Sequence, residues 1–170
     1  MQANDLKGRG VLSLSNAEKI GQVDDVLFDA QFRQILGFRV KRGGLFGKAQ
    51  ALLRDSVTSI GAAALTVQSP DAINDEARFA ELAQASTLSR AERTQVVTES
   101  GELLGSISHL EIDDDARTVT AYTLSSSLKD RVMGQDTESI KADEVIRLGE
   151  GGVMVVADAV GARLRAEREQ

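Results

Sequence analysis

The fold is decided by two stretches of sequence, Gly21-Gln-Val-Asp-Asp-Val-Leu-Phe-Asp29 and Gly105-Ser-Ile-Ser-His-Leu-Glu-Ile-Asp113. They match at a constant offset, and each follows an apolar residue and ends in aspartate. Four residues later each copy continues with a second matching run, over 34–40 and 118–124. Self-similarity of this kind is the sequence signature of a repeated structural unit. The chain therefore contains an internal repeat.

A third matching segment follows in each copy. Residues 55–61 fall on residues 143–149, and Leu65 and Val67 then fall on Val153 and Val155. Each copy is about 70 residues long, near the lower limit at which a core stabilises a domain alone. We therefore expect the two copies to pack against each other or against a partner.

The repeats have the composition of strands, because short runs of Val, Ile, Leu, Phe and Thr alternate with Gly, Asn, Asp and Ser. We expect strands near 10–15, 22–29, 34–42, 50–53 and 64–68, and near 94–98, 106–113, 118–125, 139–141 and 153–156. The apolar positions 23, 26 and 28, and likewise 107, 110 and 112, show one extra residue in an otherwise alternating pattern. An extra residue of this kind is typical of a β-bulge, which curves a strand. Many short, curved strands favour small barrels.

Two helical segments are expected outside the barrels. Pro70 opens a stretch over 72–86 whose apolar residues have mixed helical spacing, and Pro is accepted in the first turn of a helix. The charged tail over 159–170 predicts a short C-terminal helix. The predicted division is a first repeat over 1–70, a helical connector over 71–92, and a second repeat with its tail over 93–170.

Composition excludes several classes of chemistry. The chain has no cysteine, which excludes disulfides, thiolate zinc sites and cysteine nucleophiles, and its single histidine, His109, is interpreted as a surface residue. The Asp24-Asp25 pair and the Asp113-Asp-Asp115 turn lack the spacing of an acid–base dyad or a calcium loop. We therefore expect no enzyme activity, no cofactor and no metal. Without a signal peptide or an apolar run of about 18 residues, a soluble cytoplasmic protein is expected.

The repeated motifs resemble the PRC-barrel family, which includes a domain of the photosynthetic reaction-centre H subunit and the C-terminal domain of a ribosome maturation factor. The resemblance rests on residues 21–29, 35–40 and 55–61, and more weakly on their counterparts in the second copy. It implies a mainly β fold of two tandem small barrels, with a short helical connector and a short C-terminal helix. It also implies a docking or assembly role, and it supplies no catalytic residues.

Charge is distributed unevenly between the copies. Residues 1–68 contain nine basic and six acidic side chains, a net charge of +3. Residues 94–157 contain five basic and twelve acidic side chains, a net charge of −7. A difference of this kind concerns association and not fold. It is compatible with a solvated surface, and it is also compatible with attraction between copies, which would favour a homodimer.

One loop, found in the first copy only, is the candidate partner-binding site. Its glycines and flanking cations can present backbone N–H groups and positive charge to an anion. Leu45 and Phe46 either plug the mouth of the barrel or form an exposed apolar knob for a partner. The candidate residues are Lys41, Arg42, Gly43, Gly44, Leu45, Phe46 and Lys48.

The leading hypothesis is therefore a non-enzymatic docking or assembly module for a protein partner. The alternative is an RNA- or ribosome-associated factor that binds through the basic side of the first repeat. Against this alternative stand a net charge of −6 and an aromatic content of 4%, since binding to a phosphate backbone needs clustered Lys and Arg.

Overall fold

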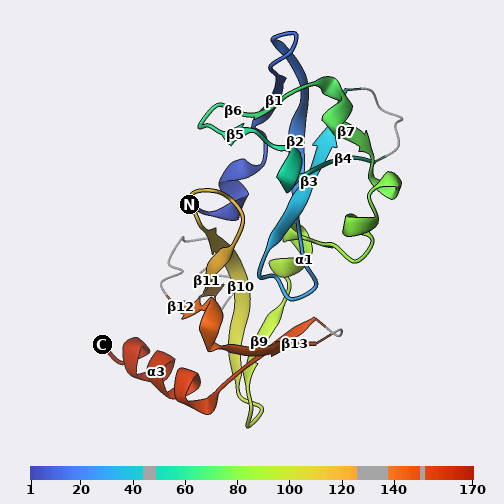
Figure 1. The fold of residues 1–170 in the computed structure, drawn as a ribbon. Coiled ribbons are helices and arrows are strands. Elements are labelled where there is room, and N and C mark those ends of the chain that lie inside the picture. The colour runs from blue at the N-terminus through green and yellow to red at the C-terminus, as the bar shows by residue number, and fades with distance from the viewer. Residues whose placement is uncertain (44–48, 126–137, 150–151) are drawn as a thin grey trace.

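The computed structural model describes residues 1–43, 49–125, 138–149 and 152–170. Over these residues the strands form two sheets, one centred on each repeat and one of them curled into a half-barrel (Figure 1). The first sheet has the order β5-β6-β1-β2-β3-β4-β7, with β8 beside β2, and the second has the order β12-β11-β10-β9-β14-β13. The predicted mainly β fold of two tandem repeats is therefore confirmed.

The two repeats contain corresponding elements in the same order, with η denoting a 3-10 helix. Those of the first repeat are η1 Ala3–Leu6, β1 Gly10–Ser13, β2 Glu18–Phe28, β3 Ile35–Lys41, β4 Gln50–Leu53, η2 Arg54–Ser56, β5 Ser59–Ile60 and β6 Ala64–Val67. Those of the second are α1 Leu88–Ala91, β9 Gln95–Thr98, β10 Leu103–Ile112, β11 Val119–Ser125, β12 Glu138–Lys141, η6 Ala142–Glu144, β13 Val145–Leu148 and β14 Val153–Val156. Each of the ten strands expected from the sequence is present.

Both long strands contain the expected bulge. In the pairing of β2 with β3 the register shifts between Val23 and Asp25, which leaves Asp24 as the extra residue. In the pairing of β10 with β11 it shifts between Ile107 and His109, which leaves Ser108 as the extra residue. The matched break in apolar spacing therefore had a structural cause at the same point of both repeats.

The last strand of the second repeat lies one residue further along than the sequence alignment placed it. Leu65 and Val67 are buried in β6, and the buried residues of β14 are Met154 and Val156, not Val153 and Val155. The preceding turn is the reason. It closes between Gly61 and Ala64 in the first repeat, but it contains one residue more in the second, where Gly149 bonds to Val153.

The connector is helical only as single 3-10 turns, so the continuous helix expected over 72–86 does not form. Its elements are η3 Pro70–Ala72, β7 Ile73–Asp75, η4 Glu76–Arg78, η5 Ala80–Leu82 and β8 Ser86–Thr87. Phe79 interrupts the turns with an extended backbone. With Leu82 it joins a small apolar cluster with Leu27 and Ala51 of the first sheet. Packing against a sheet, and not helical periodicity, therefore explains the apolar spacing of this segment.

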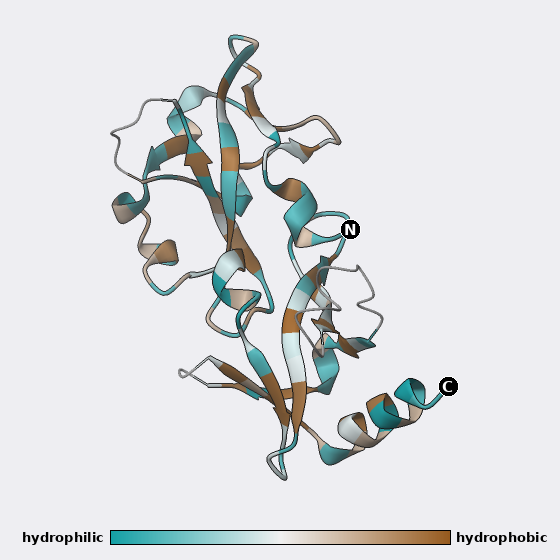
Figure 2. Ribbon diagram, turned by 180° about the vertical axis from the view of Figure 1, so that it is seen from behind, coloured by the Kyte–Doolittle hydropathy of each residue, from teal (hydrophilic) through white to brown (hydrophobic). Residues whose placement is uncertain are grey.

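A single hydrophobic core contains side chains of both repeats, among them Phe28, Phe38, Ile107 and Tyr122. Figure 2 shows that hydrophobic segments concentrate in the strands, whereas the end of the C-terminal helix is hydrophilic. The N-terminus lies beside the strands of the second repeat, since the carbonyl oxygen of Met1 accepts a 2.8 Å hydrogen bond from the amide of Ile112 (Figure 1).

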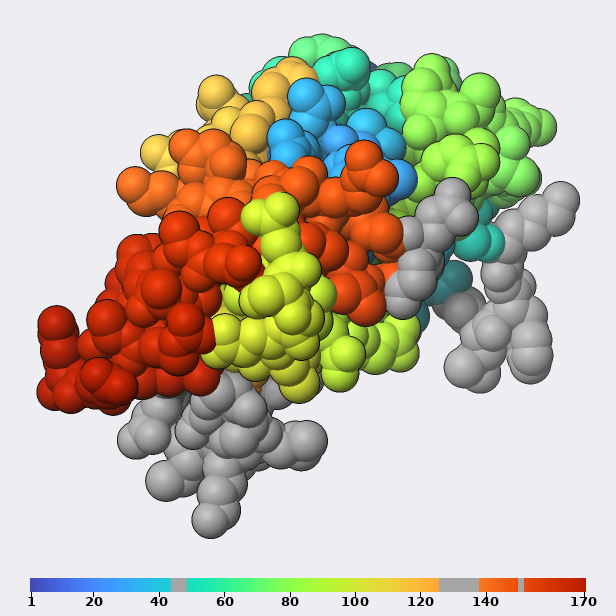
Figure 3. Space-filling model, turned by 90° about the horizontal axis from the view of Figure 1, so that it is seen from below, coloured from blue at the N-terminus to red at the C-terminus, as the bar shows by residue number. Residues whose placement is uncertain are grey.

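Helix α3, Asp158–Arg168, confirms the predicted C-terminal helix. It buries Val160, Gly161 and Leu164 and lies against the β9–β10 hairpin (Figure 3). Arginines along the helix bind acidic residues of the second repeat, as in the pair of Arg163 with Glu144. No helix in the described part of the chain is long and apolar enough to cross a membrane.

Candidate functional site

A basic end of the first sheet is formed by Lys19, Lys41 and Arg42, and we use that name for these three residues. Antiparallel pairing of β2 with β3 brings Gln22 opposite Lys41, so the start of β2 lies beside the end of β3. Alternation along β3 buries Val40 and exposes Lys41. Arg42 donates from Nε to the carbonyl oxygen of Ile20 at 3.2 Å, which holds its side chain along the start of β2.

Of the seven candidate residues from the sequence, three can be placed. Lys41, Arg42 and Gly43 are exposed, and Gly43 has a φ of 81°, the left-handed region that glycine favours. The remaining candidates lie outside the described residues; they are Gly44, Leu45, Phe46 and Lys48. The alternative roles of Leu45 and Phe46, plug or exposed knob, therefore stay predictions.

Sequence reasoning missed Lys19. This residue is 22 positions before Lys41, and only the register of β2 against β3 brings it to the same end of the sheet. Its aliphatic stem crosses Gly10, where a Cβ atom would lie 3.1 Å from Cε of Lys19. The hairpin pattern of two predicted strands was the signal that could have found it.

Some cationic side chains of the described chain pair with a carboxylate, whereas those of the basic end, like Arg78 and Arg147, do not. Arg39 pairs with Glu76 at 2.9 Å, and Arg117 pairs with Asp55 at 2.8 Å. Among the described residues, by contrast, no carboxylate oxygen lies within 4.0 Å of the cationic groups of Lys19, Lys41 or Arg42. The side chains are therefore available to an anionic group of another molecule.

The second repeat has no counterpart of the basic end. Strand equivalence places Leu103 at the position of Lys19 and Ser125 at the position of Lys41. Leu103 is 57% exposed and apolar, and Ser125 is buried. Among the described residues, this group of three cations thus belongs to the first repeat alone.

The two carboxylates beside the first bulge lie in different surroundings. Asp24 is exposed and Asp25 is buried, as expected for adjacent residues of a strand. Asp25 accepts hydrogen bonds from its neighbour's amide, Val26 N, at 2.8 Å and from Ser89 Oγ at 3.3 Å, and it lies 3.8 Å from Lys7 Nζ. The pair therefore does not converge on one point.

His109, interpreted from the sequence as a surface residue, is partly buried in β10. It follows the second bulge, and its neighbour Leu110, not His109, belongs to the hydrophobic core. Over the described parts of the chain, no group of three or more His, Asp or Glu side chains could hold a metal ion.

A cleft of about 430 Å³ lies at the junction of the repeats, and both of its arginines have partners within the chain. Arg54 is buried and donates to the carbonyl oxygen of Asp115 from Nη2 at 2.6 Å and from Nε at 3.0 Å. Burial lowers the pKa of Arg54, and the nearby charge of Arg117 lowers it further. The remaining charges are those of Asp55, which pairs with Arg117, and Glu81. The cleft joins the repeats and carries no net charge.

The fold can now be compared with known proteins. The model of the PRC-barrel domain matches the chain twice, over residues 1–72 and 85–160. The chain belongs to the PRC-barrel family. The PRC-barrel domain is in general non-catalytic, and domains of this kind often mediate protein interactions. A search of curated proteins found no match to the chain.

Proposed function

We propose that this PRC-barrel chain is a non-enzymatic docking module, and that its first repeat binds a protein partner through the basic end. The observation that carries the proposal is the local charge imbalance at Lys19, Lys41 and Arg42, whose cationic groups have no carboxylate partner among the described residues. Exposed charges contribute little to folding stability, so substitution of these three residues tests association without disturbing the fold.

The chemistry of the partner follows from this surface. Three cations at the start of one strand and the end of its neighbour suit a short acidic segment, with the guanidinium of Arg42 available for a carboxylate. An exposed interface of this kind sets orientation and association rate more than affinity. We therefore propose an acidic protein segment as the partner.

An RNA partner would use the same cations. Phosphate binding, however, needs a larger continuous basic surface, and the chain has a net charge of −6 with a single tyrosine and no tryptophan for base stacking. A protein partner is the better match to a small basic surface on an acidic molecule. The two partners are distinguished in the experiment below.

The test is affinity capture from a lysate of the source cell, with and without nuclease. We expect a bound protein that survives nuclease and is lost with the double substitution Lys41→Glu, Arg42→Glu. The matched control is Lys141→Glu, Arg147→Glu, which reverses two exposed charges in the second repeat. This control should retain the partner, and all variants should melt within a few degrees of the wild type.

Two results would contradict the proposal. Loss of the captured material on nuclease treatment would favour the RNA alternative. Equal capture by the Lys41→Glu, Arg42→Glu variant and the wild type would exclude the basic end as the contact surface.

A further inference from the structure

The two repeats meet through a symmetric pair of backbone hydrogen bonds. The amide of Ile35 donates to the carbonyl oxygen of Arg117 at 2.8 Å, and the amide of Val119 donates to the carbonyl oxygen of Arg33 at 2.8 Å. Ile35 and Val119 occupy equivalent positions in the repeats, and so do Arg33 and Arg117. Contacts that are reciprocated in this way define a two-fold, self-complementary interface. The chain is therefore arranged like a dimer within one molecule.

The N-terminal segments of the repeats are exchanged across this interface. Thr87, just before α1 of the second repeat, pairs with Leu27 of β2 in the first repeat. Gln2, just before η1 of the first repeat, pairs with Glu111 of β10 in the second repeat. Each repeat thus completes the sheet of the other, and neither edge of β2 or β10 is left without a neighbour at these points.

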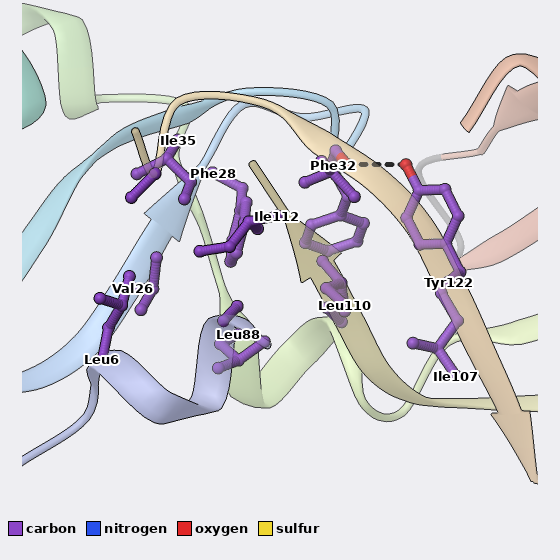
Figure 4. Packing of buried hydrophobic residues seen from close by; sticks show 14 of the residues in the cluster. Leu6, Val26, Phe28, Phe32, Ile35, Leu88, Ile107, Leu110, Ile112 and Tyr122 are labelled. Carbon is purple, nitrogen blue, oxygen red and sulfur yellow. Dashed lines mark hydrogen bonds between the residues drawn. The ribbon is translucent and has the colours of Figure 1, made fainter. Parts of the chain in front are cut away.

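One buried contact breaks the symmetry. The hydroxyl group of Tyr122 donates to the carbonyl oxygen of Phe32 at 2.7 Å, and both groups are buried (Figure 4). The position equivalent to Tyr122 in the first repeat is Phe38, which has no hydroxyl group. Pairing of two first repeats would therefore leave the carbonyl oxygen of Phe32 buried without this donor, which is costly.

A difference in side-chain volume disfavours the other like pair, that of two second repeats. The turns that cross the interface carry Phe32 in the first repeat and Ala116 in the second, both buried and both at a φ of 50°. The ring of Phe32 packs edge-on against Phe28 (Figure 4). Pairing of two second repeats would place alanine where the core holds a phenyl ring, and such a void is destabilising.

A third contact disfavours the pairing of two second repeats. The guanidinium of Arg54, which follows β4, binds the carbonyl oxygen of Asp115 in the turn of the second repeat. The equivalent residue after β12 is Ala142, which has no donor in its side chain. Two second repeats would lose this contact on both sides of the interface.

We infer that the junction face of each repeat is a pairing surface that selects an unlike repeat. The partner that fits the first repeat is a second repeat, either from the same chain or from another copy of it, and like pairs are disfavoured. Specificity of this kind arises from penalties on the wrong partner as much as from contacts with the right one. The inference concerns the junction and is independent of the basic end.

The test begins with the intact chain. A protease recognition sequence is inserted between Ala83 and Gln84, two exposed residues of the connector, and the folded protein is then cleaved. We expect both halves to elute together on gel filtration at the mass of the 18.2 kDa chain. Separation of the halves without denaturant would overturn the inference.

Selectivity is measured by mixing. Cleaved protein with the natural isotopes is mixed with cleaved ¹⁵N-labelled protein, and native mass spectrometry identifies every pair that forms. We expect mixed-isotope pairs of a first with a second repeat, with like pairs at least tenfold less abundant. Like pairs that are as abundant as unlike pairs would overturn the inference. If the cleaved halves do not exchange, the mixture is unfolded and refolded, and the formation of like pairs at that stage would also overturn it.

The selecting contact is tested in the same cleaved protein. Tyr122→Phe should raise the dissociation constant of the unlike pair about tenfold, the effect of one buried hydrogen bond. The matched control is Thr120→Val, which removes a hydroxyl on the same strand whose bond to the carbonyl oxygen of Glu111 stays within the second repeat. Equal effects of the two substitutions would exclude Tyr122 as a selector.

Discussion

Gly161 allows helix α3 to lie directly against Thr98, because a Cβ atom at Gly161 would lie 2.8 Å from the Cγ2 atom of Thr98. The next neighbours of this position are Oε2 of Glu102 at 3.4 Å and Cδ2 of Leu104 at 3.5 Å. The helix therefore packs on the β9–β10 hairpin at a distance that only glycine permits.

Gly161→Ala should lower the free energy of unfolding. Alanine favours a helix by about 1 kcal/mol over glycine, but overpacking a buried contact costs about 1–3 kcal/mol. We expect a net loss of up to about 2 kcal/mol in urea unfolding. Thr98→Ser should reverse most of this loss, since it removes the methyl group and keeps the hydroxyl that accepts from the amide of Glu102. A stabilised Gly161→Ala variant would contradict this packing.

Tyr122 should titrate at unusually high pH. Burial raises the pKa of Tyr122 to about 12, and the charge of Asp29 contributes in the same direction. The ordinary value is near 10, so the folded state favours the neutral phenol. The stability that the neutral phenol contributes to the folded state is fully present below pH 10 and is lost as the pH rises through about 12.

The measurement is direct because Tyr122 is the single tyrosine and the chain has no tryptophan. Phenolate absorbance of the folded protein should have a midpoint about two units above that of the urea-unfolded protein. Between about pH 10 and pH 12, the free energy of unfolding of the wild type should fall by about 2–3 kcal/mol more than that of the Tyr122→Phe variant. Equal midpoints in the folded and unfolded protein would contradict the burial of this hydroxyl.

Ala17→Gly should stabilise the protein. Ala17 is exposed in the turn between β1 and β2 and has a φ of 56°, a conformation that costs an L-residue about 1 kcal/mol. We expect a gain of about 0.5 kcal/mol, because glycine also increases the entropy of the unfolded chain. The control is Ala63→Gly, an exposed loop position without a positive φ, which should be neutral or destabilising.

The charge difference between the repeats predicts a homodimer that weakens with salt. Two exposed edges are already covered. Gln31 bonds to the backbone of Leu148 in β13, and Arg163 bonds to the carbonyl oxygen of Ser139 in β12. Association would then depend mainly on charge, which salt screens. Light scattering should report a dimer at low salt, and a monomer at low salt and high protein concentration would refute the prediction.

The strands were predictable because the pattern of apolar residues for each strand occurs in both repeats. A matched break in apolar spacing identified the bulges at Asp24 and Ser108, since chance rarely places the same interruption in two copies. The short strands β5, β7, β8 and β13 were missed. Their two to four residues are too few for a periodic pattern, and their pairing depends on neighbours elsewhere in the chain.

The errors have physical causes. The connector was interpreted as a helix because Phe79 and Leu82 have helical spacing, but these side chains pack onto the outer face of the first sheet. Of the candidate partner-binding residues, Lys41 and Arg42 are exposed, and their role in binding stays a prediction. Lys19 could be added only once the strand register was known. The exchange of segments was not predictable, because Gln2 meets Glu111 only through the tertiary fold.

The exchanged segments also determine when the protein can fold during its synthesis. Leu27 can pair with Thr87 only after half of the chain has been made. Gln2 can pair only after Glu111 has been synthesised. A chain dominated by such distant pairings folds slowly and exposes strand edges meanwhile. The first repeat therefore leaves the ribosome well before it can be completed, and shielding of β2 in that interval becomes part of the biology of the protein.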